Sequence, residues 1–518
     1  MLIRTNGNGQ KPHALLLYPK TGLDLGSTVA PPHALLTVAA PMLKAGYAVK
    51  LLDQRVEPIT EDILRGLVSS DLMAVGISTM TGTQVYFSLM LAKMIRAVAP
   101  NVPIVWGGCH PSVTPEQTLS HPLVDIVAVG EGDYTLLDIV EALGAHRSLC
   151  HVPGILYKDG PTPVKTLPRP LLNVEELLAT PWELVDAGKY VHKDMYVRDR
   201  ERCLDIGQTS RGCPFDCSFC SSASIRERKW RAMSVDRVLD DLKEAISRFK
   251  LDAWWWRDDE FYIKRKRAHA IMEGIVQAGI DGSFYTSGTR CDVFGKATED
   301  EVALMKRAGA HTLKFGAESG SQRILDLMQK GITVEQTLEA NQKCRRHGIT
   351  PAFALMIGYP TETFQEIDQT IDLGYRLKRE NPRAELETMA QYTPLPGTPD
   401  WNLALKHGLQ PPNSLEEWAN WNFDEYDLEG RKSPWYPRNE RRWLGNISYL
   451  SILANSLDNV VTSLKNPWVR WPARAVVKPA SAYFKWRLAS HRYRWMPELE
   501  AVRILRERLF YRSTWTFE

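Results

Sequence analysis

Cysteine is scarce in this sequence, with eight in 518 residues, and this count excludes a small secreted scaffold held together by disulfides. A large excess of positive or negative residues is also missing. The 64 Lys and Arg against 61 Asp and Glu leave a net charge of +3, far too small for a protein that coats nucleic acid. No apolar run approaches the about 20 residues of a membrane-spanning helix, and residues 1–20 lack the apolar core of a signal peptide. We therefore expect a globular protein of the cytoplasm.

Residues 1–146 have the pattern of a first domain, because a chain of this length exceeds what one hydrophobic core usually supports. Short, almost continuously apolar segments alternate there with helical ones, as in parallel strands covered on both faces. We expect strands at 14–18, 47–52, 72–77, 103–106 and 124–129, and helices at 34–45, 84–99 and 134–143. The pattern predicts a flavodoxin-like, doubly wound α/β domain, which would bind ligands beyond the carboxyl ends of its strands.

Three further regions follow. Residues 147–200 are proline-rich and predict a linker that contains a hairpin. Residues 201–410 hold a second βα series, with strands expected near 203–209, 252–257, 283–287, 312–316, 352–357 and 386–391. Six βα units are too few for a closed eight-stranded barrel, so we expect a partial (βα)6 barrel. Residues 411–518 predict a mostly helical C-terminal region, rich in aromatic and basic residues.

Three cysteines stand close together at the start of the predicted barrel, namely Cys213, Cys217 and Cys220. Soft thiolates at such spacing favour zinc, copper(I) or an iron–sulfur centre. Structural zinc takes four protein ligands, whereas a cubane cluster held by three cysteines keeps one iron open for another ligand. The alternatives are an incidental group of cysteines or a zinc ion completed by a distant residue such as His192 or Cys203.

The spacing Cys-x3-Cys-x2-Cys after the first barrel strand resembles the radical S-adenosylmethionine (SAM) superfamily. The resemblance implies that Cys213, Cys217 and Cys220 ligate a 4Fe–4S cluster, whose open iron chelates SAM and whose electron cleaves it to a 5′-deoxyadenosyl radical. It also implies that Phe219 packs near the adenine. An electron donor such as flavodoxin or ferredoxin is then an expected partner.

Residues after the second and third barrel strands extend the resemblance. Many members hold the SAM amino group with a Gly-Gly-Glu-like segment, but this chain has Asp258, Asp259 and Glu260 there. That segment resembles the variant of cobalamin-binding members, and we take Asp259 and Glu260 as the candidates. Any single acid here could equally be one that stabilises a helix N-terminus. Arg290 is a candidate partner of the SAM carboxylate or ribose, or a surface ion-pair residue.

The later strand ends are also similar to those of the family. Glu318 and Gly320 stand in a Gly-Ala-Glu-Ser-Gly segment that resembles the ribose-contacting strand end, with Glu318 as the hydroxyl acceptor. Gly358 and Pro360 belong to a glycine-rich segment that resembles the strand end near the adenine. Each match alone is an ordinary turn sequence, and their order behind the cysteine loop is what supports the assignment.

A flavodoxin-like domain ahead of such a barrel resembles the cobalamin-binding branch of the superfamily. Gly107, Gly108, Glu131 and Gly132 lie at strand ends, where glycine lets a bulky corrin approach the backbone. The chain lacks the Asp-x-His-x-x-Gly motif whose histidine ligates cobalt, and we take His110 as a contact of the cofactor's tail or loop. The alternative is a degenerate domain that holds no corrin.

The resemblance implies a cobalamin-dependent methyltransferase that acts on an unactivated carbon of a hydrophobic or lipid-like small molecule. One alternative is a non-methylating oxidative cyclase of the anaerobic magnesium-porphyrin type. Another is an iron–sulfur redox or electron-transfer protein. A methylthiolating enzyme would need a further cluster-binding cysteine set, and the other five cysteines show no such spacing.

The C-terminal region bears on the substrate and the location. Ten of the 16 Trp lie beyond residue 400, and residues 459–497 contain eight Lys and Arg but no acid. This composition predicts a helical cap on the barrel, with a membrane interface formed by 468–471 and 483–487 as the next alternative. Nucleic acid is the least favoured partner. A cytoplasmic protein with peripheral contact at the inner membrane face is thus the second expectation for its location.

Overall fold

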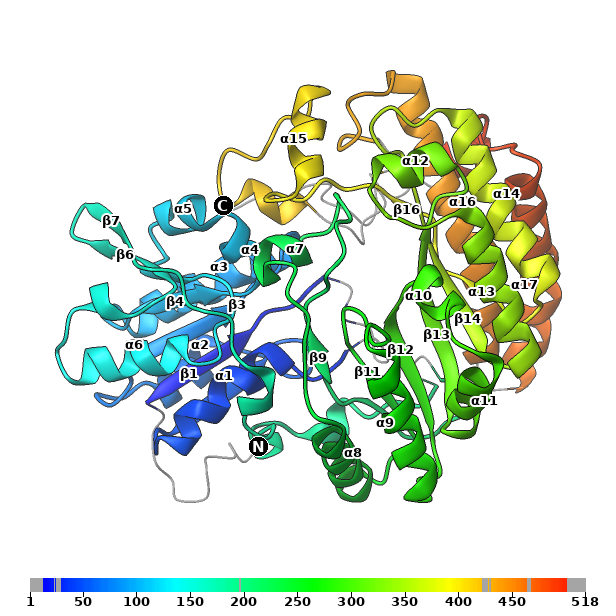
Figure 1. Ribbon diagram of the computed structural model, residues 1–518. Coiled ribbons are helices and arrows are strands. Elements are labelled where there is room, and N and C mark those ends of the chain that lie inside the picture. Colours follow the sequence, from blue (N-terminus) through cyan, green and yellow to red (C-terminus); the bar gives the residue numbers. More distant parts are fainter. Residues whose placement is uncertain are drawn as a thin grey trace.

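A computed structural model describes residues 13–22, 24, 29–194, 197–421, 427, 430–463 and 467–500 of the chain. Two parallel α/β units face each other, the first blue to cyan and the second green to yellow, and the C-terminal helices lie outside the second (Figure 1). This arrangement confirms the predicted fold class, a doubly wound N-terminal domain followed by a partial barrel and a helical C-terminal region.

Five parallel strands form the first sheet in the order β2-β1-β3-β4-β5, the order of flavodoxin-like folds. They are β1 (Ala14–Tyr18), β2 (Val49–Asp53), β3 (Ala74–Ser78), β4 (Ile104–Gly107) and β5 (Ile126–Ala128). Each lies within two residues of a predicted strand. Their almost unbroken apolar sequences are explained by burial on both faces.

Helices cover both faces of this sheet, and the alternation of side chains along β1 decides which core each residue joins. Leu16 packs in one core with residues of α1 (His33–Lys44) and α6 (Thr135–Gly144). Leu15 and Leu17 pack in the other with residues of α2 (Glu61–Leu67) and α3 (Thr83–Val98). Two short helices, α4 (Cys109–Val113) and α5 (Pro115–Ser120), follow β4.

The hairpin predicted in the linker belongs to the first sheet. Strand β6 (Ile155–Asp159) pairs antiparallel with β5, and β7 (Thr162–Lys165) pairs with β6. The sheet therefore continues past residue 146. The linker beyond it contains the 3-10 turns η3 (Val174–Glu176), η4 (Trp182–Leu184) and η5 (Ala187–Lys189), after η2 (Leu149–His151) ahead of the hairpin.

The second sheet is the partial barrel, with neighbouring parallel strands in the order β8-β11-β12-β13-β14-β15. Its strands are β8 (Cys203–Asp205), β11 (Ala253–Trp256), β12 (Ser283–Thr289), β13 (Ala310–Glu318), β14 (Thr350–Ile357) and β15 (Glu385–Leu386). The last predicted strand is split, because β16 (Ala390–Gln391) pairs separately with the end of β14. A two-stranded ribbon of β9 (Ser210–Arg211) and β10 (Arg231–Ala232) flanks the cysteine loop.

Helices connect the barrel strands and bury their apolar stripes against them. The longer ones are α8 (Val235–Phe249), α9 (Arg265–Gln277), α11 (Glu299–Arg307), α13 (Val334–His347) and α14 (Phe364–Glu380). Shorter ones are α7 (Ser222–Arg226), α10 (Cys291–Gly295) and α12 (Gln322–Leu327). Helices α11, α13 and α14 each begin with a threonine in a capping box, which satisfies backbone N–H groups that the helix itself cannot.

The C-terminal region packs on both units. Helices α16 (Arg438–Ser463) and α17 (Pro467–Ala489) pack on each other, and leucines of both join the barrel core. Helix α15 (Pro399–Lys406) and η6 (Glu417–Asn420) instead add Trp418 and its neighbours to a core of the first domain. The side chains of Trp468 and Trp471 lie outside the described residues. Within the described part of the chain, no helix is long and apolar enough to span a bilayer.

Candidate functional site

The cysteine loop lies beyond the carboxyl ends of the barrel strands, between β9 and α7 (Figure 1). It is reached through Gly212, whose φ of +84° is in the left-handed region. A Cβ atom at this position would lie 2.3 Å from the backbone oxygen of Lys229, so the turn requires glycine. Cys213, Cys217 and Cys220 are all partly exposed, and the backbone N–H of Cys220 donates to the oxygen of Cys217 at 3.2 Å.

The three thiols are near enough to influence one another electrostatically. Burial, with smaller contributions from Glu260, Cys217 and Cys220, raises the pKa of Cys213 to about 12. In the described residues, no three Cys, His, Asp or Glu side chains are gathered as ligands of one metal ion. The donor set itself fits an iron–sulfur cluster, because it offers three soft thiolates from one loop. Binding would release the thiol protons.

A buried cation lies beside the loop. Nη1 of Arg290 is 3.6 Å from Sγ of Cys217, and its guanidinium is 3.7 Å from the ring centre of Phe215. The side chain is held by Asp292 at 2.9 Å and by the backbone oxygen of Lys330 at 2.6 Å. Arg290 is therefore fixed against the cysteine loop and is not a surface ion-pair residue.

Glu318 forms an ion pair with Lys330, a residue that the sequence analysis did not single out. The two charged atoms are 2.7 Å apart, and Lys330 is buried with Nζ 5.7 Å from the ring centre of Phe219. Burial lowers the pKa of Lys330, but Glu318 and Cys217 outweigh this effect and the pKa is raised. A Cβ atom at Gly316 would meet both charged groups at 2.4 and 2.6 Å, so that glycine makes room for the pair.

The three acids after β11 have different surroundings. Asp259 is exposed and accepts a hydrogen bond from the backbone N–H of Gly212 at 2.9 Å, beside the cysteine loop. Asp258 is buried, accepts from Thr209 at 3.0 Å, and has its pKa raised to about 6 by burial. Glu260 is buried too, and its pKa is raised to about 8 by burial. Of the three, Asp259 is the acid exposed at the loop.

The glycine-rich end of β14 is organised by Glu362. Its Oε2 accepts from the backbone N–H groups of Gly358 at 2.6 Å and Tyr359 at 3.0 Å. Its Oε1 is buried and has no hydrogen-bond partner among the described residues. Burial raises the pKa of Glu362 to about 8. Pro360, between them, is buried as well.

Gly320 has a packing role. A Cβ atom there would lie 2.2 Å from the backbone oxygen of Gln369 on α14, and the Gly320 N–H donates to Oγ1 of Thr370 at 2.9 Å. These contacts set the distance between the end of β13 and α14. The Gly320 backbone is thereby packed against α14.

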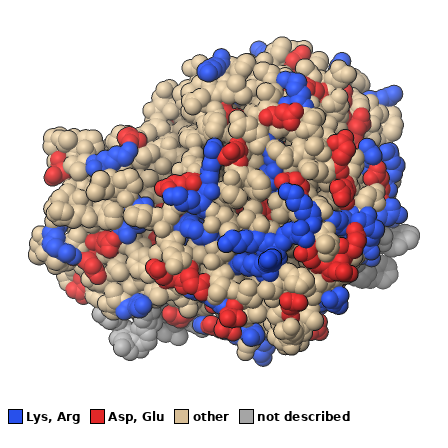
Figure 2. Space-filling view, viewed as in Figure 1, with Lys and Arg blue, Asp and Glu red and all other residues tan. Residues whose placement is uncertain are grey.

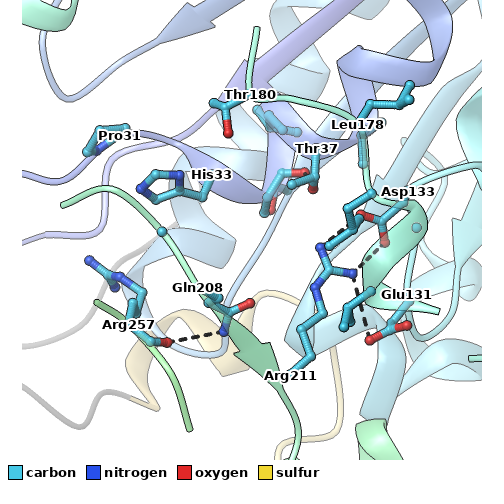
Figure 3. Close-up of a pocket in the computed structure, with 18 of the residues that line it drawn as sticks. Pro31, His33, Thr37, Glu131, Asp133, Leu178, Thr180, Gln208, Arg211 and Arg257 are labelled. Atoms are coloured by element: carbon cyan, nitrogen blue, oxygen red, sulfur yellow. Dashed lines mark hydrogen bonds and ion pairs between the residues drawn. The ribbon is translucent and has the colours of Figure 1, made fainter. Parts of the chain in front are cut away.

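A large cleft separates the two α/β units (Figure 3). It has a volume of about 2300 Å³, part of it open to solvent, and is lined by the carboxyl ends of β1, β3, β4 and β5 on one side and by residues 206–211 on the other. Gly107, Gly108, Glu131 and Gly132 all line it. Gly108 has a φ of +101°, and a Cβ atom there would lie 2.7 Å from the oxygen of Thr79. Open space at Gly130 and the apolar side chains among the lining residues fit a bulky ligand such as a corrin.

His110 does not line this cleft. It is fully buried in α4, with Thr81 and Thr114 each 3.2 Å from a ring nitrogen and Trp418 edge-on at 5.3 Å between ring centres. Burial lowers its pKa to about 3, so the ring is neutral. The structure therefore does not bring His110 together with the other candidate residues of the N-terminal domain.

Three arginines join two carboxylates of the N-terminal domain to the segments on either side of the cysteine loop, and none of these contacts was foreseen from the sequence. Arg211, two residues before Cys213, forms a bidentate ion pair with Asp133, both contacts at 2.9 Å (Figure 3). Glu131 accepts from Arg226 at 2.7 Å and from Arg231 at 2.7 Å, which lowers its pKa to about 2. The oxygens of Glu131 are thus occupied by the other domain.

A second polar group lies at the opposite end of the cleft. His33, on α1, is 3.1 Å from Oδ1 of the buried Asp205 on β8, and Nε of Arg257 donates to Oδ2 at 2.6 Å. Both His33 and Arg257 line the cleft (Figure 3). No motif in the sequence connects these residues, since His33 and Asp205 are 172 positions apart.

Comparison with known families matches two parts of the chain. The family model of the B12 binding domain matches residues 26–140, and that of the radical SAM superfamily matches residues 208–374. The two matches therefore coincide with the doubly wound domain and with most of the barrel.

Several characterised or named proteins are similar over most of the chain. An uncharacterized methyltransferase of Pyrococcus horikoshii is 34% identical, over 74% of this chain and 80% of that protein. The hopanoid C-3 methylase of Methylococcus capsulatus is 30% identical, over 75% of this chain and 70% of that protein. The anaerobic magnesium-protoporphyrin IX monomethyl ester cyclase of Cereibacter sphaeroides is 25% identical over 76% of this chain, which spans only 62% of the cyclase.

Two solved structures share the fold. OxsB with aqua-cobalamin and S-adenosylmethionine bound has a TM-score of 0.72 at 19% identity, covering 96% of this chain and 75% of that one. TsrM from Kitasatospora setae with cobalamin and a [4Fe-4S] cluster bound has a TM-score of 0.66 at 15% identity, covering 92% and 100%. At this identity the likeness shows a common arrangement of the two α/β units.

Proposed function

Because this chain belongs to the cobalamin-binding branch of the radical SAM superfamily, we propose that it is a methyltransferase acting on an unactivated carbon of a hydrophobic small molecule. The observation that carries the proposal is that the strand ends of the N-terminal domain and the segment before the cysteine loop line the same cleft. Arg211 lines the cleft above the strand ends of the B12-binding domain and directly precedes the cysteine loop. A methyl donor on one side and a radical source on the other would therefore face the same space.

The cofactors of the family are a 4Fe–4S cluster, SAM and cobalamin, and residues of this chain fit each of them. Cys213, Cys217 and Cys220 would hold the cluster. Asp259 would accept a hydrogen bond from the SAM amino group, and the glycines that line the cleft would leave room for the corrin. When bound, these groups supply one-electron chemistry and a methyl donor.

The chain's own residues orient the groups at the barrel rim and shield them from water. Arg290 places a positive charge against Sγ of Cys217, where it would balance the negative charge of a cluster held by the loop. Lys330 donates to one oxygen of the Glu318 carboxylate, so that the other oxygen can accept a hydrogen bond from a hydroxyl group. Glu362 fixes the turn after β14 through two backbone N–H groups. These buried contacts keep the rim of the barrel rigid and limit water near a reactive site.

A lipid-like substrate and peripheral contact with a membrane are part of the proposal. Tyr483 is 44% exposed, Trp486 48% and Trp495 77%, and the guanidinium of Arg492 lies 4.7 Å from the ring centre of Trp486. Exposed aromatic rings next to arginine are typical of surfaces that meet anionic headgroups. We expect the protein to sediment with vesicles containing phosphatidylglycerol but not with phosphatidylcholine vesicles. In cells, this contact would be made at the cytoplasmic face of the membrane.

Anaerobic oxidative cyclisation is the second candidate, and the similarity to the magnesium-porphyrin cyclases supports it. The test uses anaerobically reconstituted protein with SAM labelled as trideuteromethyl, a chemical reductant and a hydrophobic extract of the source cells. Transfer of the label to an organic product supports the methyltransferase. Deoxyadenosine with an unlabelled, oxidised product supports the cyclase, and absence of deoxyadenosine overturns both.

A further inference from the structure

Basic side chains gather on the surface next to the cysteine loop. Figure 2 shows a strip of Lys and Arg across the middle of the face seen in Figure 1, over β9 and the start of α9. Two basic runs of the sequence meet there, Arg226–Arg231 and Lys264–Arg267. They are separated by more than 30 residues in the chain, so the folded structure creates the surface.

The first run packs directly on the loop. Arg228 pairs with Asp216, between Cys213 and Cys217, at 2.9 Å, and its side chain is still 48% exposed. The backbone oxygen of Lys229 lies next to Gly212, while its side chain is 64% exposed and pairs with the exposed Glu227 at 2.7 Å. This segment thus borders the exposed part of the cysteine loop, which includes Pro214 and Asp216.

Trp230 connects the first run to the second. Its ring centre is 5.6 Å from Nζ of Lys264 and 5.9 Å from the guanidinium carbon of Arg267. Its indole N–H donates to the backbone oxygen of Glu260 at 3.1 Å, which anchors the ring to the barrel rim. Lys264 and Lys266 are exposed, and neither forms an ion pair with any acid in the described part of the chain. Their charges are therefore available to a partner.

We propose that Arg228, Lys229, Lys264 and Lys266 form the docking surface for a small acidic one-electron carrier protein. The inference rests on the proposed function, because the family's chemistry consumes one electron and supplies no donor of its own. A carrier seated here would face the exposed edge of the cysteine loop, next to the metal centre that this loop would hold. Complementary charge raises the association rate and orients the partner, and it does so less as salt increases.

Charge reversal tests the surface. The variant Lys264→Glu/Lys266→Glu changes two side chains that contact neither cysteines nor cleft. Its matched control is Lys44→Glu/Lys93→Glu, two exposed lysines on helices α1 and α3 of the N-terminal domain. With a reduced acidic flavodoxin at low salt, we expect kcat/KM for the carrier to fall roughly tenfold or more in the first variant and to stay unchanged in the control. With dithionite, both variants should match the unmodified protein.

A second measurement does not depend on activity. A carbodiimide that joins carboxylates to amines without a spacer should cross-link flavodoxin to Lys264, Lys266 or Lys229, as mapped by mass spectrometry, and 0.5 M NaCl should abolish these cross-links. Cross-links confined to other lysines would overturn the inference. An equal loss of activity with dithionite would also overturn it, because the surface would then serve an anionic substrate. If the unmodified protein cleaves no SAM with dithionite, the proposed function fails, whereas the cross-linking result still decides the docking surface.

Discussion

Removing the charge of Asp133 should loosen the contact between the B12-binding domain and the cysteine loop. In Asp133→Asn the buried Arg211 keeps one hydrogen-bond acceptor but loses its bidentate carboxylate. Breaking a buried ion pair by removing one partner costs about 3–5 kcal/mol, since the other charge stays buried without compensation. Glu131 remains 3.8 Å from Nη1 of Arg211 and offsets part of this cost, so we expect about 2–3 kcal/mol.

The assay is hydrogen exchange on the intact protein, together with titration of hydroxocobalamin followed by its absorption spectrum. Because about 1.4 kcal/mol corresponds to a factor of ten, backbone amides of residues 130–133 and 210–212 should exchange roughly 30- to 140-fold faster. Cobalamin should bind more weakly, since Gly130 and Gly132, which line its cleft, lie on the same loop as Asp133.

The matched control is Asp138→Asn, which breaks the pair of Asp138 with Arg169 on the surface of the same domain. This pair is partly exposed, so its loss should change the free energy of unfolding by less than about 1 kcal/mol. The double variant Asp133→Asn/Arg211→Gln should recover part of the lost stability, because it removes the stranded charge. Equal exchange rates in Asp133→Asn and the control, or strictly additive effects in the double variant, would refute the reasoning.

Three more predictions concern the loop and the domain contact. Cys217→Ala should lack the brown chromophore of a 4Fe–4S cluster and form no deoxyadenosine, whereas Cys150→Ala, at an exposed cysteine of the linker, should keep both; turnover in Cys217→Ala would remove the proposed mechanism. Because its arginines lower the pKa of Glu131 from 4.5 to about 2, the carboxylate stabilises the fold fully above pH 4.5, and this contribution should be lost as pH falls toward 2. In Glu131→Gln the melting temperature should depend less on pH across that interval, and an unchanged pH dependence would contradict the assignment. Gly212→Ala should reduce iron content severalfold, because its Cβ would meet the oxygen of Lys229 at a left-handed φ, and a full complement of iron would show that the turn tolerates a side chain.

The amino-acid sequence by itself determined the two α/β units, their order and the cysteine loop. Short, almost continuously apolar runs between turn residues predict buried parallel strands, and each predicted strand of the first sheet lies within two residues of an observed one. The spacing of Cys213, Cys217 and Cys220 is likewise a local property, legible without knowledge of what surrounds the loop. These features depend on neighbours in the chain, which is why they could be predicted.

Only the tertiary structure decided which polar residues face the cleft and which are buried. Asp133 and Arg211 are 78 positions apart, and their pairing depends on how two domains meet. Trp418, more than 300 residues away in sequence, packs against His110, which is buried and does not line the cleft. Asp258, Asp259 and Glu260 are adjacent, yet only Asp259 is exposed. Burial, and with it the cost of a charge, is set by segments distant in the chain, and no local pattern contains that information.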